Sequence, residues 1–86
     1  MEIVYSADFV KSVRLLPKSV RKKLADLLGI LERYPFHPRL HTKPLAGPLS
    51  GFYSFRITRD WRVIFKFINS SKIFLIDAAH RSDIYK

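Results

Sequence analysis

The apolar residues of this 86-residue chain recur with two different periods, and the first period is helical. Glu2 to Tyr5 alternates briefly, as in a short strand, and Ser6 then offers a helix N-cap. Pro17 ends one short helix and opens the next. The apolar positions that define the two helices are Phe9, Val13 and Leu16, then Val20, Leu24, Leu27, Leu28 and Leu31. Because charged residues face away from the second stripe, we expect a helical hairpin with one buried side.

The second period is that of strands, and it governs the C-terminal half. Three segments rich in Phe, Ile, Val and Tyr are separated by links of three residues, 58–60 and 69–71. Links this short favour antiparallel hairpins. The predicted strands are Phe52 to Ile57, Trp61 to Ile68 and Lys72 to Ala79. The segment from 34 to 48 carries four prolines and is predicted to be a connecting loop.

The predicted fold class is therefore α+β, with one domain spanning residues 1–86. A helical hairpin packs on a small antiparallel sheet made of the short N-terminal strand and the three-stranded meander. Strand parity puts the aromatic residues on one face. If that face covers the helices, Arg56, Arg62 and Lys66 emerge together on the open face. Trp61 shares the aromatic face and is expected in the core.

Charge narrows the range of partners. Sixteen Lys and Arg oppose seven acids, giving a net charge of +9 and a pI near 10.3. Such a field favours a polyanion such as nucleic acid. There is no cysteine, no apolar run long enough to span a membrane, and no signal-peptide pattern. We expect a cytoplasmic protein that does not bind membranes.

The chain end gathers further chemistry next to these cations. His80, Arg81 and Tyr85 follow the last strand. Cations together with an imidazole and a phenol are suited to phosphodiester chemistry, which needs charge for the phosphate and proton donors and acceptors for the oxygens. His37 and His41 have the spacing of a helical metal site, but prolines break that helix and no ligand set is completed. We predict no metal site.

The order of these elements and motifs resembles the RelE/ParE superfamily of type II toxin–antitoxin toxins. The resemblance runs from Phe9 to Tyr85, and the segments that carry it are KPLAGPLSG, YSFRI, RDWRVIFKF and the closing AAHRSDIY. It implies the RelE-like fold and the activity of the RelE, YafQ and HigB type. Such enzymes cleave mRNA on the ribosome without metal or cofactor, through attack of the ribose 2′-hydroxyl on the adjacent phosphate. The implied partners are the ribosome, mRNA and an acidic cognate antitoxin encoded beside the toxin.

The same resemblance assigns site residues. It implies catalytic roles for Arg56, Arg62, His80 and Tyr85, and contacts to RNA phosphates for Lys43, Arg59, Lys66 and Arg81. Asp60 matches a family aspartate with a catalytic or structural role. Lys43 and Arg56 stand where some family members have histidines, so the general base is not identified.

Other interpretations remain open from the sequence. Arg62 could pair with Asp77 across adjacent strands, and Tyr85 could clip the C-terminus to the core. A ParE-like inhibitor of DNA gyrase has the same fold and needs no catalysis. An inactive chain that only binds RNA or antitoxin is a third interpretation.

Overall fold

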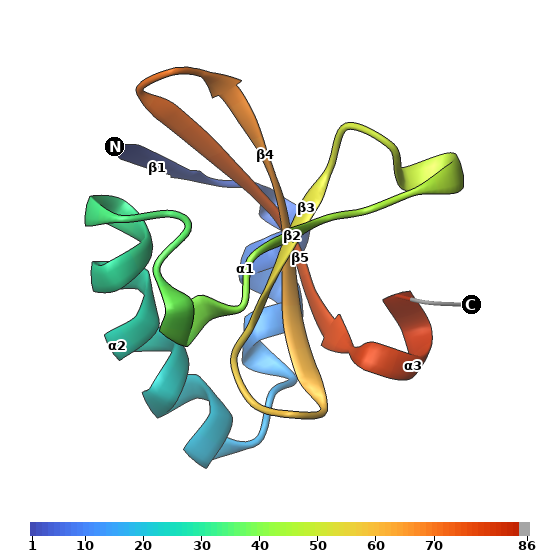
Figure 1. Ribbon diagram of the computed structural model, residues 1–86. Coiled ribbons are helices and arrows are strands. Elements are labelled where there is room, and N and C mark those ends of the chain that lie inside the picture. Colours follow the sequence, from blue (N-terminus) through green and yellow to red (C-terminus); the bar gives the residue numbers. More distant parts are fainter. Residues whose placement is uncertain (85–86) are drawn as a thin grey trace.

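A five-stranded sheet forms the centre of the protein, with helices α1 and α2 on one side and α3 on the other (Figure 1). This computed structural model describes residues 1–84. The helices are α1 (Ala7–Arg14), α2 (Lys18–Arg33) and α3 (Arg81–Ile84), with 3-10 turns η1 (Pro38–Leu40) and η2 (Gly47–Leu49). The strands are β1 (Glu2–Tyr5), β2 (Lys43–Pro44), β3 (Tyr53–Arg56), β4 (Trp61–Asn69) and β5 (Lys72–His80).

The strand order is β1-β5-β4-β3-β2, so the predicted meander lies in the middle of the sheet. The α+β class, the hairpin of helices and the three meander strands are confirmed. Two details differ from the sequence prediction. The sheet is mixed because β1 runs parallel to β5, and the proline-rich loop contributes the two-residue strand β2 beside β3. A parallel pair needs a connection of a dozen or more residues, and the chain from α1 to β4 supplies it between β1 and β5.

The core lies between the sheet and the two longer helices. On the helical side the core is formed by the predicted apolar stripe of α2. On the sheet side it is formed by Phe55, Val63, Phe65 and Leu75. Trp61 packs against this cluster while remaining half-buried, in agreement with its predicted position. The parity prediction is therefore correct for the aromatic face.

Two serines at the start of α1 and within it form hydrogen bonds to β5 where the pairing of β5 with β4 is irregular. The pairing of β4 with β5 shifts register so that Ile76 has no direct partner. Ser6 Oγ donates to the Ile76 carbonyl at 2.9 Å, and the Ala78 N–H donates to Ser12 Oγ at 3.0 Å. Ser6 Oγ also accepts from the Phe9 N–H, as predicted for the N-cap. The helix thus satisfies backbone groups that the bulge takes out of the strand ladder.

Candidate functional site

A row of polar side chains crosses the sheet face that is turned away from α1 and α2. The register places Arg56 of β3 directly opposite Arg62 of β4, and Lys43 of β2 opposite Ser54 of β3. Side chains two residues apart on a strand share a face, so Ser54 and Arg56 project together. The structure therefore brings three predicted cations, Lys43, Arg56 and Arg62, into one group, which we call the basic row.

Burial distinguishes the members of this row. Arg62 is only 6% exposed and Ser54 only 1%, whereas Arg56 is half-buried and Lys43 is exposed. The prediction that Arg62 emerges on an open face is therefore wrong. The sequence prediction left this face uncovered, but α3 lies on this side of the sheet (Figure 1), and β2 extends the sheet beside β3.

Arg62 is held by the turn that precedes it. One of its terminal nitrogens donates to the carbonyl oxygen of Arg59 at 3.2 Å. The opposing register position on β5 is Ala79, while Asp77 lies opposite Ile64. The register partners of Arg62 are therefore Arg56 on β3 and Ala79 on β5.

Arg56 and Ser54 carry buried polar atoms for which the described part of the chain supplies no hydrogen-bond partner. Arg56 Nε and Ser54 Oγ are both buried and have no hydrogen-bond partner within residues 1–84. Such groups cost free energy and call for an explanation such as a ligand. Ser54 was not among the predicted site residues. The sequence offered a signal for it, because Ser54 lies two residues before Arg56 and therefore shares its strand face.

Two predicted phosphate contacts lie apart from the centre of the row. Lys66 is exposed, sits over the ring of Phe74 at 5.7 Å, and is four residues from Arg62, or about 13 Å along the strand. Arg59 is exposed in the turn between β3 and β4. Both add to the positive field around the site without joining the contacts within the row.

The start of α3 is tied to the turn between β3 and β4. The Arg81 N–H donates to the Asp60 carbonyl at 2.7 Å, and Arg81 Nε lies 3.9 Å from Asp60 Oδ1. Of the two roles left open for Asp60, this geometry favours the structural one. Through these two contacts Arg81 links the start of α3 to the turn between β3 and β4.

His80 ends β5 one residue beyond Ala79, the register partner of Arg62, so strand parity places it on the sheet face of Trp61 and not on that of Arg62. It pairs with Trp61, and the two rings meet edge to face with centroids 5.3 Å apart. The Ser82 N–H donates to His80 Nδ1 at 3.2 Å, and Ser82 Oγ lies 2.9 Å from the same nitrogen. His80 is half-buried at the rim, beside the basic row rather than within it. Tyr85 lies outside the described residues.

The histidines of the proline-rich loop serve its local structure. His37 Nδ1 accepts from the Arg39 N–H at 3.1 Å, and His41 takes a left-handed conformation, with φ of 49°, at the end of η1. Across residues 1–84, no three His, Asp or Glu side chains are grouped so that they could hold a metal ion.

Comparison with known proteins gives sequence matches over part of the chain and structural matches over nearly all of it. No family model matches the chain. Toxin YoeB of Escherichia coli strain K12 is 35% identical over 54 residues, which span 63% of this chain and 64% of that relative. The match therefore covers less than two thirds of the relative's length.

Among solved structures, the YoeB/ParE toxin from Agrobacterium tumefaciens aligns with a TM-score of 0.79 at 22% identity, covering 94% of this chain and 99% of that one. The toxin of the E. coli DinJ–YafQ toxin–antitoxin complex aligns with a TM-score of 0.78 at 22% identity, covering 99% and 97%. The predicted RelE-like fold is thus confirmed. With the YoeB match, these likenesses also bear out the resemblance to the RelE/YafQ-like toxin superfamily. No helix of the described chain has the length and apolar character needed to cross a membrane.

Proposed function

We propose that this protein is the toxin of a type II toxin–antitoxin system and that it cleaves mRNA on the ribosome without a metal ion. Arg56 and Arg62 are the centre of its catalytic site, with Lys43 beside them on β2. His80 and Tyr85 are the proposed proton-transfer groups of the chain end.

The observation that carries this proposal is the pair of arginines placed directly opposite each other on β3 and β4. Like charges in that position destabilise a sheet, because their Cβ atoms are about 4.5–5.5 Å apart. A phosphate bound between them reverses the sign of the interaction, and each guanidinium can give it two parallel hydrogen bonds. A phosphodiester in this position is therefore contacted by both guanidinium groups.

The chemistry follows from charge that develops during the reaction. When a ribose 2′-hydroxyl attacks the neighbouring phosphorus, negative charge builds on the non-bridging oxygens, and the bond to the 5′ oxygen breaks. Donors already fixed in place stabilise that charge without reorganising. Arg62 meets this requirement because burial and its bond to the Arg59 carbonyl hold it in position.

The remaining steps are two proton transfers. A base must accept the 2′-hydroxyl proton, and an acid must protonate the leaving 5′ oxygen. His80 is the proposed acid at the rim of the site. Lys43 is the member of the basic row that β2 supplies, and it is exposed, so Lys43→Ala tests whether this residue takes part in the proton transfer from the 2′-hydroxyl.

A cognate antitoxin of opposite charge is the proposed partner. The YafQ structure that this chain resembles is a complex with the antitoxin DinJ. A net charge of +9 attracts an acidic segment and speeds its encounter with the toxin. We propose that this segment masks the basic row, either directly or by displacing the chain end.

Induced expression in bacteria separates this function from gyrase inhibition. We expect translation to stop and mRNA to shorten while plasmid supercoiling stays normal, and we expect co-expression of an acidic antitoxin to restore growth. Arg62→Ala is the matched variant and should remove the arrest. Gyrase-linked DNA breaks with intact mRNA would contradict the proposal and support a ParE-like inhibitor.

A further inference from the structure

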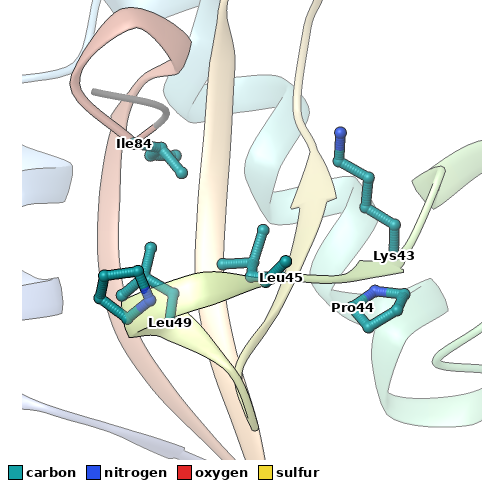
Figure 2. Close-up of a pocket in the computed structure, with 7 residues that line it drawn as sticks. Lys43, Pro44, Leu45, Leu49 and Ile84 are labelled. Carbon is teal, nitrogen blue, oxygen red and sulfur yellow. The ribbon is translucent and has the colours of Figure 1, made fainter.

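A hollow of about 430 Å³ opens at the β2 end of the basic row, between the segment from β2 to η2 and helix α3. Figure 2 shows Ile84 of α3 across from Leu45 and Leu49, with Lys43 toward one end. Its lining is completed by Pro44, Ala46 and Pro48. Six of its seven lining residues are apolar, and the seventh is a cation.

The walls of this hollow are already formed in the free protein. Leu45 is buried and Ile84 is 7% exposed, so both are fixed by packing. Two prolines restrict the backbone of the loop wall. The volume lies within the range of about 300–1,000 Å³ that is typical of small-ligand sites.

We propose that this hollow holds one nucleobase of the RNA, next to a phosphate bound at Lys43. The inference rests on the proposed function, because it takes the basic row as the place of the RNA backbone. An apolar hollow beside a row of cations matches a nucleotide, because the flat faces of its base suit apolar contact and its anionic phosphate is joined to that base through one sugar. The lining contains no acid, so nothing in it repels the backbone. The hollow thereby becomes a subsite that selects the base beside the cut.

Apolar contact and shape must carry this selection. Bases can be held between apolar side chains, and a pocket that gains or loses a small group discriminates by about 10–200-fold. Ala46 is exposed, extended and part of the lining, so a larger side chain at this position fills the hollow without entering the core. Ser50 is exposed on the same loop and lies outside the lining, which makes Ser50→Phe the matched control for Ala46→Phe.

The binding test uses nuclear magnetic resonance with two small probes. Adenosine monophosphate should shift the methyl signals of Leu45, Leu49 and Ile84, while ribose 5-phosphate should leave those methyls unchanged. Ala46→Phe should weaken adenosine monophosphate binding at least about tenfold, and Ser50→Phe should not. Equal shifts with both probes, or undiminished binding to Ala46→Phe, would overturn the subsite.

A second arm separates the subsite from the proposed function. On ribosomes, Ala46→Phe should change which bases flank the cuts, disfavouring purines, while Ser50→Phe keeps the parent pattern. If the probes bind as expected but no RNA is cleaved, the subsite stands and the proposed function fails. If an acidic leucine-containing peptide shifts the three methyls and adenosine monophosphate does not, the hollow is a protein-partner site and the inference is wrong.

Discussion

At the scale of single residues, Arg62 combines burial with a position opposite a second arginine. The sequence identified this residue through strand parity and resemblance, yet placed it on an open surface. Parity reports which face a side chain takes, but not what covers that face. The helix α3 on this side of the sheet has four residues, and the strand β2 that widens the sheet has two, so both are too short to give a periodic signal.

Replacing Arg62 should remove activity by at least about 10²-fold, because one fixed donor to the transition state is lost. We expect Arg62→Lys to lose most activity as well, since an ammonium cannot reproduce the planar two-point contact. Arg21→Ala, at an exposed position of α2, is the control for charge alone. Single-turnover cleavage, with unfolding measured on each variant, decides the matter. Folded Arg62→Lys and Arg62→Ala proteins with parental rates would refute the assignment.

Substitution of Asp60 tests whether this residue has a structural or a catalytic role. Because its pair with Arg81 is exposed and 3.9 Å long, Asp60→Ala should lower the free energy of unfolding by less than about 1 kcal/mol. The backbone bond from Arg81 to the Asp60 carbonyl stays in place. Glu2→Ala removes another exposed ion pair, that with Lys72, and serves as the control. Cleavage should be unchanged in both, whereas a loss of about 10²–10⁴-fold in Asp60→Ala alone would make it a proton-transfer residue.

At the scale of secondary structure, the sequence predicted the elements whose patterns are long. The five apolar positions of α2 and the alternation of β4 and β5 extend over many residues. The elements it missed are β2, which has two residues, and α3, which has four. The proline-rich composition of the loop concealed β2, and its pairing with β3 is a tertiary contact that local pattern does not encode. Missing these two elements also concealed the burial of Ser54 and the hollow beside Lys43.

The attachment of α1 to β5 should weaken when one of its two serine hydroxyls is removed. Ser12→Ala leaves the Ala78 N–H without its acceptor, and an unsatisfied buried donor costs about 1–3 kcal/mol. Ser19→Ala, at an exposed position in the first turn of α2, should change the free energy of unfolding little. Denaturant titrations of the two variants provide the comparison. Equal stabilities would show that the bulge of β5 does not need α1 to satisfy it.

At the scale of the whole molecule, the net charge of +9 should dominate association with RNA. If six or more phosphates are contacted, affinity for ribosomes should fall by about 10³-fold or more between 50 and 200 mM salt. Each released counterion steepens the fall of log affinity with log salt concentration, so Lys66→Ala and Arg59→Ala should make this dependence shallower. Binding isotherms at several salt concentrations measure it. A flat response would remove the electrostatic basis of the proposal.

The central claim is that the fold and the basic row together make a metal-independent ribonuclease. Its most direct test is cleavage of a defined mRNA by the purified protein on purified ribosomes, after metal contaminants bound to the protein have been removed with a chelator. We expect cuts in the ribosomal A site that leave 2′,3′-cyclic phosphate ends, at the parental rate in the chelated protein and at least about 10²-fold slower in Arg62→Ala. Intact mRNA in the presence of the chelated parent protein, or products that carry 3′-hydroxyl ends, would contradict it.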